Sequence, residues 1–153
     1  MAATTVKRAD QIVPANANEK TVLSFHTSLM KHDLDAFAAI WTEGAIHEHP
    51  WRTETMPPAI VGRKQITDSY RNMFANRKDM VFTINGLHQT ANPDCIVVEF
   101  NGRSLVGETG NIYEQNYVGF FHLRDGKIDR LRLYFDPSIS QRALAKIMPK
   151  ADG

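Results

Sequence analysis

The chain has 153 residues, of which 42% are hydrophobic and 23% are charged, and its formal net charge at pH 7 is +1. This length suits one domain built around one hydrophobic core. A charge so close to zero gives no long-range field that would attract nucleic acid or an anionic membrane, so we expect neither as a partner.

The N-terminal segment, residues 1–18, is polar and has no regular hydrophobic period. It also lacks the apolar stretch of a secretory signal, and apolar runs elsewhere, such as residues 95–98, are too short to span a bilayer. We therefore expect a cytoplasmic protein with a flexible arm over residues 1–18 and a single domain over residues 19–148.

Two amphipathic helices are predicted next. Apolar side chains recur at three- and four-residue spacing from residue 19 to Trp41, with one interruption at Asp33. Asp33 is expected to cap the second helix, because its carboxylate can accept the free N–H groups of the first turn. Gly44 is expected to end that helix.

A short strand over residues 45–51, a rigid proline-containing loop over residues 56–62 and a third helix over residues 63–76 are predicted to follow. The remainder is rich in β-branched and aromatic residues separated by turn signals. It predicts four strands, over residues 80–88, 94–103, 111–123 and 127–135. Asp136 and Pro137 have the residue types of the N-cap and first position of a last helix.

Helices followed by a run of antiparallel strands indicate an α+β fold, in which a curved sheet wraps around helices packed on one of its faces. Such a sheet leaves a cavity between its concave face and the helices, where a small ligand can bind.

Two segments resemble a known superfamily. KHDLDAFAAIWTEGAIHEHPW (residues 31–51) and YEQNYVGFFHLRDGKIDRLRLYFDPSISQRAL (residues 113–144) are similar to the SnoaL-like, ketosteroid isomerase-like branch of the nuclear transport factor 2-like superfamily. The second segment looks most like the phenazine-biosynthesis A/B proteins. The resemblance implies a cone-shaped, cystatin-like fold with an antiparallel or mixed sheet and an apolar pocket.

The resemblance also implies roles for single positions. His49 stands where the ketosteroid isomerases carry their carboxylate base, and a neutral imidazole can take that role. Phe25 and Val118 replace the oxyanion tyrosine and aspartate of those enzymes. Leu133 and Ser69 replace an acidic residue and a histidine of the phenazine-biosynthesis proteins.

The histidines of the HEHP sequence leave three interpretations open. Side chains alternate along a strand, so His47, His49 and Trp51 share one face, which the resemblance turns inward. His49 is then a general base, a structural imidazole at the pocket rim, or part of a metal site with His47 and with Glu48 or Glu54.

Asn116 is expected beside the pocket, because it shares a face with Val118 and the resemblance turns Val118 inward. Its amide either donates a hydrogen bond to a substrate carbonyl or braces a neighbouring loop. On the last strand, Leu133 and Phe135 are expected in the pocket wall, and the arginines opposite them are expected on an outer face that is solvated or that contacts a second copy of the chain. The full predicted ligand-binding set is Phe25, Trp41, His47, Trp51, Ser69, Tyr70, Met73, Val98, Val118, Leu133 and Phe135.

Two functions are consistent with the predicted fold and site residues. The first is an isomerase, cyclase or dehydratase that acts on a hydrophobic carbonyl compound without an organic cofactor, with His49 as base and Asn116 as hydrogen-bond donor, assisted by a tyrosine or water. The second is a noncatalytic binding or accessory protein that uses the same pocket. The expected partners are a hydrophobic small molecule and a second copy of the chain, which forms a homodimer through the outer face of the sheet.

Overall fold

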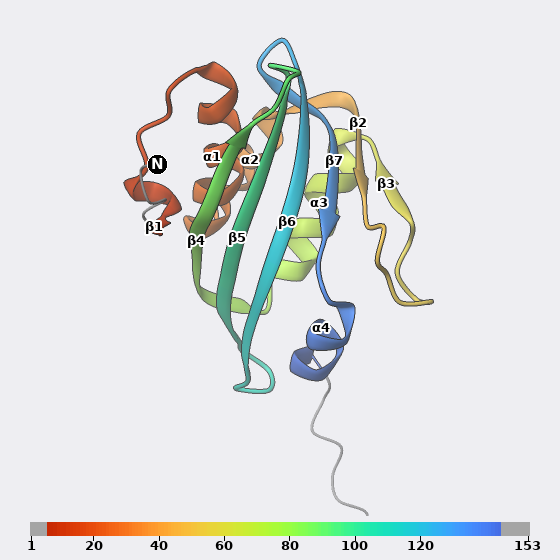
Figure 1. Cartoon of the computed structure of the whole chain (residues 1–153). Helices are drawn as coiled ribbons and strands as arrows, with labels where there is room; N and C mark the ends of the chain where they lie inside the picture. The colour runs from red at the N-terminus through yellow and green to blue at the C-terminus, as the bar shows by residue number, and fades with distance from the viewer. Residues whose placement is uncertain (1–5, 145–153) are drawn as a thin grey trace, which may run out of the picture.

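A computed structural model describes residues 6–144 and contains one mixed, curved sheet with strand order β1-β4-β5-β6-β7-β2-β3 (Figure 1). Neighbouring strands are antiparallel except for the parallel pair β2 and β7. The strands are β1 (Lys7–Arg8), β2 (Trp41–Glu48), β3 (Ala59–Val61), β4 (Arg77–Gln89), β5 (Cys95–Val106), β6 (Ile112–Arg124) and β7 (Lys127–Tyr134). This is the α+β architecture that the sequence predicts.

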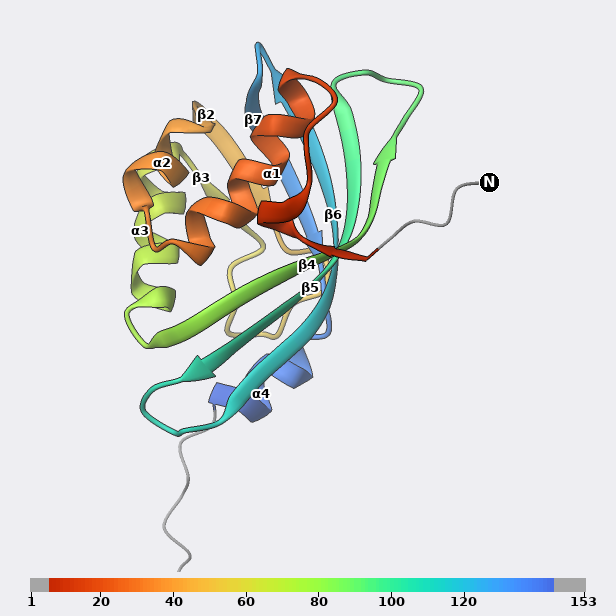
Figure 2. The same ribbon diagram turned by 90° about the vertical axis from the view of Figure 1, so that its left-hand side faces the viewer.

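Helices α1 (Ala17–Met30), α2 (Leu34–Ala39) and α3 (Arg63–Phe74) lie together on one side of the sheet (Figure 2). Helix α4 (Pro137–Leu144) follows β7 and packs against β6. Local capping explains where helices begin: the carboxylate of Asp33 accepts the backbone N–H of Ala36 at 3.0 Å. None of the helices in residues 6–144 is both long enough and apolar enough to cross a bilayer, and the cytoplasmic location stays a prediction.

Several predicted boundaries differ from the structure. The second helix ends at Ala39 rather than at Gly44, because Trp41 begins β2 and places its side chain in the core. The proline-containing loop includes strand β3, which pairs with β2.

The predicted arm contains ordered structure in its described part. Lys7 and Arg8 form β1 and pair with β4, Ala9 is buried, and α1 begins at Ala17, before the predicted start of the domain. Residues 1–5 and residues 145–148 of the predicted domain lie outside the described range.

The core between α1 and the sheet is aromatic and encloses one histidine. The ring of His26 lies 4.4 Å from the ring of Phe100 and 5.4 Å from that of Phe82, centroid to centroid. Its Nδ1–H donates to the carbonyl oxygen of Val22 at 2.9 Å, and its Nε2 is buried without a partner in the described residues. Burial lowers the pKa of His26 from 6.5 to about 4, so the ring is neutral at pH 7.

The inner face of β6 is opposite to the one that the resemblance implies. Tyr113 and Gln115 are buried on the concave side, whereas Asn116 is exposed on the convex side and accepts a hydrogen bond from the Asn101 amide at 3.1 Å. Val118 shares the outer face with Asn116. The prediction that Asn116 and Val118 face the cavity is therefore wrong, although the alternation itself is correct.

Candidate functional site

A cavity of about 330 Å³ lies between the concave face of the sheet and the helices. Helices α1 and α3, the segment around β3, strands β4 to β7 and helix α4 all contribute to its wall. Most of the lining is apolar, and none of the described lining residues is Asp or Glu. The cavity suits a small, largely apolar molecule that is oriented by a few polar groups.

His49 is the imidazole in the cavity wall. It follows β2, where its backbone N–H donates to the carbonyl oxygen of Pro58 at 3.1 Å, and its ring meets the edge of Phe135 at 5.9 Å. Its Nδ1 is buried without a partner among the described residues, whereas its Nε2 is unpaired there but keeps accessible surface. Burial lowers the pKa of His49, so the ring is neutral at pH 7 and Nε2 can accept a proton.

His47 lies behind His49, away from the cavity. Its ring stacks on that of His49 at 4.4 Å and on that of Trp41 at 5.9 Å, and its Nε2 is 2.7 Å from the hydroxyl of Tyr70 on α3. Burial, with the neighbouring His49, lowers the pKa of His47, and burial raises that of Tyr70, so both groups are neutral at pH 7. His47 therefore packs against the ring of His49 and does not line the cavity.

Arg77, at the start of β4, is a buried cation in the cavity wall. Only 5% of its surface is exposed, its guanidinium carbon lies 4.4 Å from the centre of the Tyr113 ring, and its Nη1 donates to Ser104 Oγ at 3.2 Å. It forms no ion pair with a carboxylate of residues 6–144. Burial lowers the pKa of Arg77, yet a guanidinium stays charged at neutral pH.

A chain of hydroxyl groups lies next to Arg77. The Tyr117 hydroxyl donates to the Tyr113 oxygen at 3.0 Å, and the Tyr113 hydroxyl is 3.4 Å from Ser140 Oγ on α4. Gln115 braces this chain, because its amide donates to Tyr113 at 2.9 Å and to the backbone carbonyl of Asp136 at 3.0 Å. Burial raises the pKa of Tyr117, so its hydroxyl remains a donor.

Seven of the predicted site residues line this cavity, and Met73, which is 40% exposed, is the most accessible large apolar side chain among them. They come from α1, α3, the end of β2 and the end of β7, segments that are distant in sequence. The seven are Phe25, His49, Ser69, Tyr70, Met73, Leu133 and Phe135.

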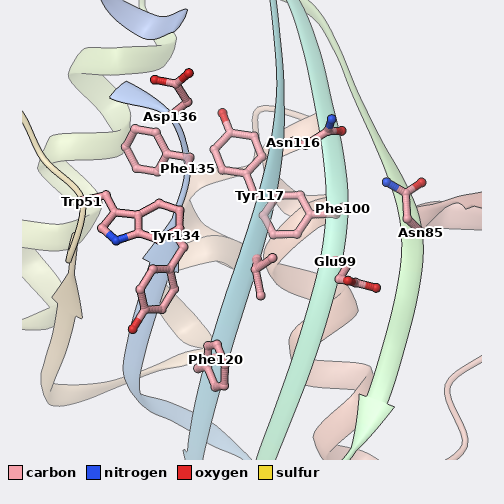
Figure 3. Close-up of a pocket in the computed structure, with 11 residues that line it drawn as sticks. Trp51, Asn85, Glu99, Phe100, Asn116, Tyr117, Phe120, Tyr134, Phe135 and Asp136 are labelled. Carbon is pink, nitrogen blue, oxygen red and sulfur yellow. The ribbon is translucent and has the colours of Figure 1, made fainter. Parts of the chain in front are cut away.

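The other predicted residues lie elsewhere. Trp41, His47 and Val98 are fully buried in the core. Trp51, Asn116 and Val118 line a second, more open hollow of about 580 Å³ on the outer face. In Figure 3 the labelled side chains of this hollow include Trp51 beside Tyr134, whose rings are 5.2 Å apart. These six residues do not line the inner cavity.

Sequence reasoning missed Arg77, Ser104, Tyr113 and Tyr117. The two tyrosines belong to one alternating set, and the resemblance places that set on the outer face. Arg77 follows a helix in a run of polar and charged residues, where an arginine normally faces solvent. Within residues 6–144, no three His, Cys, Asp or Glu side chains are grouped in a way that could hold a metal ion.

The curved sheet, the helices on its concave side and the enclosed cavity define a protein of the nuclear transport factor 2-like, ketosteroid isomerase-like fold class. The chain belongs to the SnoaL-like domain family, whose model matches residues 22–131.

Three relatives illustrate this placement. The uncharacterised protein YesE of Bacillus subtilis (strain 168) is 28% identical over 124 residues, which are 81% of this chain and 84% of YesE. A crystal structure of a candidate isomerase from Bacillus subtilis has a TM-score of 0.79 and 26% identity, and the match covers 86% of this chain and 96% of that one. A phenazine biosynthesis-related protein from Pseudomonas aeruginosa has a TM-score of 0.69 and 21% identity, with 90% of each chain covered, and supports the fold alone.

Proposed function

We propose that the inner cavity binds a hydrophobic carbonyl compound and that the protein transforms it, as an isomerase, cyclase or dehydratase, by acid–base catalysis without an organic cofactor. One observation carries this proposal: His49 is a neutral imidazole in the wall of a largely apolar cavity, and its Nε2 has no partner among the described residues. An unpaired, neutral nitrogen in such a place is a suitable proton acceptor.

In this mechanism His49 Nε2 removes a proton from the carbon next to the substrate carbonyl. The negative charge that develops on the carbonyl oxygen needs a hydrogen-bond donor, and Asn116 cannot supply it from the outer face. The hydroxyl of Tyr117 takes this place in the proposed mechanism, and to do so it turns its proton from the Tyr113 oxygen to the substrate. The protonated His49 then returns the proton to another atom of the substrate, which isomerises it, or to a leaving hydroxyl, which dehydrates it.

The stacked histidine pair supports this role. Because His47 lies 4.4 Å from His49, a second positive charge in the pair would be unfavourable, and Tyr70 holds His47 in place through the 2.7 Å hydrogen bond. Burial, which lowers the pKa of His49, disfavours its premature protonation, and the stack holds its ring in place. A base kept neutral in this way is active at pH 7 and also below its ordinary pKa of about 6.5.

The test is deuterium exchange into 2-tetralone, an apolar bicyclic ketone, in D₂O, followed by proton NMR. The His49→Ala variant should lose a factor of about 100 to 10,000 in the exchange rate. His88→Gln, which removes a half-exposed histidine on β4, should match the wild type. The wild-type rate should rise with pH and reach its plateau below about pH 6.5, because burial lowers the pKa of His49.

Equal exchange by the wild type and His49→Ala would overturn the assignment of His49 as the base. Binding of 2-tetralone by the wild type with no exchange above the buffer rate would instead favour the noncatalytic binding protein, since the same cavity then holds a ligand without transforming it.

We also propose that a second copy of the chain docks on the outer face, over the hollow lined by Trp51, Phe120 and Tyr134. Trp51 is 61% exposed, and clustered exposed aromatic groups are typical of protein interfaces. In light scattering after gel filtration, Trp51→Ser should shift the wild-type dimer toward monomer. Val13→Ser, which removes another exposed apolar side chain away from this hollow, should leave the dimer intact. A monomeric wild type would refute the dimer.

A further inference from the structure

The buried guanidinium of Arg77 is the one charged group that lies deep in the cavity wall among the described residues. The other arginine of the lining, Arg103, directs its side chain outward, where it is half exposed and pairs with Glu114. Arg77, in contrast, is 5% exposed and has no carboxylate partner within residues 6–144. Burying an uncompensated charge is costly, so a structure that keeps one has a reason to do so.

The neighbours of Arg77 do not neutralise it. Ser104 accepts one of its hydrogen bonds and the face of the Tyr113 ring lies against it, while its remaining N–H groups donate to no other described residue. A guanidinium has several donors in a planar fork that matches the two oxygens of a carboxylate. Most of these donors are therefore available to a ligand.

The surroundings bring no competing anion. Neither Asp nor Glu occurs among the described lining residues, and the hydroxyl protons of Tyr113 and Tyr117 are donated to Ser140 and to Tyr113. A carboxylate placed there would meet the cation of Arg77 in a largely apolar wall, where charge-assisted hydrogen bonds are strong. A neutral ligand of the same shape would leave the cation unpaired.

We propose that Arg77 binds a carboxylate of the ligand, so that the substrate is an apolar carbonyl acid rather than a neutral ketone. This inference rests on the proposed function, because it assigns the substrate class of the same cavity. It divides the cavity into an anion-binding end around Arg77 and a proton-transfer end at His49.

The experiment compares 2-naphthoate with 2-naphthamide, which has the same ring system and a neutral head group. Isothermal titration calorimetry on the wild type should give a dissociation constant at least about 10-fold lower for naphthoate. Arg77→Gln should reduce this preference to less than about 2-fold while leaving the affinity for naphthamide nearly unchanged. Arg71→Gln, which removes an equal charge from the exposed face of α3, should retain the full preference.

A second variant tests the proposal if Arg77→Gln does not fold. Arg77→Lys keeps the charge and loses the fork, so it should keep a carboxylate preference that is about 3-fold smaller than that of the wild type. The result that overturns the proposal is a wild type that binds both ligands equally, or an Arg77→Gln variant that is folded and retains the full preference.

These outcomes are separable from the failure of the proposed function. His49→Ala should bind naphthoate with the wild-type preference, because His49 is not part of the anion-binding end. If naphthoate binds selectively while no exchange activity is found, the carboxylate site stands and the catalytic proposal fails. If neither naphthalene ligand binds the wild type, the carboxylate site fails, whereas the catalytic proposal still stands or falls with exchange into 2-tetralone.

Discussion

Acidification should destabilise this protein strongly, because a neutral histidine is sealed in its aromatic core. His26 is fully buried, and its pKa is lowered from 6.5 to about 4 by burial, against the smaller raising effect of its hydrogen bond to the Val22 carbonyl. Between these two values the unfolded chain binds a proton that the folded protein excludes. The free energy of unfolding therefore falls as the pH falls through this window and is insensitive to His26 above it.

The size of the effect follows from the two pKa values. The difference of about 2.5 pH units between 6.5 and about 4, at about 1.36 kcal/mol for each unit, gives about 3 kcal/mol. This is a large share of the total stability of a domain, which is about 5–15 kcal/mol. His47 and His49, whose pKa values burial also lowers, act in the same direction.

Urea unfolding at about pH 7 and about pH 4, followed by circular dichroism, measures this contribution in the wild type and in His26→Phe. Phenylalanine suits the surrounding rings and does not titrate, so the variant should lose about 3 kcal/mol less than the wild type between the two pH values. Phe100→Leu disturbs the same packing without removing a titrating group, so its loss should equal that of the wild type. If His26→Phe and the wild type lose the same free energy of unfolding between the two pH values, the buried neutral histidine is not the cause of the acid destabilisation.

Three further changes test local contacts by urea unfolding at pH 7. Tyr70→Phe removes the hydroxyl that lies 2.7 Å from His47 Nε2 and should cost about 1–3 kcal/mol, since a buried nitrogen loses its partner; a cost below about 0.5 kcal/mol would contradict this. Asp136→Ala removes the carboxylate that accepts the Ser138 N–H at 2.9 Å and should cost about 1 kcal/mol, whereas Asp136→Asn should cost clearly less; equal losses would count against capping. Gly102→Ala would place a methyl group 2.8 Å from a phenylalanine ring of β4 and should cost about 1–3 kcal/mol; an unchanged stability would mean that the ring moves freely.

The elements that depend on short-range signals could be predicted from the sequence. The cap at Asp33, the start of the last helix at Asp136 and the turn between β6 and β7 all depend on residues within a few positions of one another. The end of the second helix could not be predicted in this way. Trp41 continues the helical spacing, but its large ring is more stable in the core at the start of a strand.

The orientation of β6 is a second feature that the local sequence pattern does not predict. Alternation divides the strand into two sets, but each set mixes polar and apolar residues, so hydropathy alone does not decide which one is buried. The inner set can bury its polar members because Tyr113, Gln115 and Tyr117 form hydrogen bonds with one another. This is a tertiary property that no local pattern reports.

The position of Arg77 depends on the same long-range packing. Its burial arises because β4, β5 and β6 bring Ser104 and Tyr113 around it. Of the candidate site, the sequence therefore predicted His49 and the apolar wall but not the polar end.

The parallel pairing of β2 with β7 has a consequence for the order in which the molecule is assembled. His47 on β2 is paired with Leu131 on β7, a residue that is synthesised 84 positions later. At about 5–20 residues per second, a growing chain carries β2 without this neighbour for on the order of ten seconds. Strands β4 to β6 form consecutive hairpins and can pair in the meantime, so the side of the cavity that includes His49 and Leu133 forms after them.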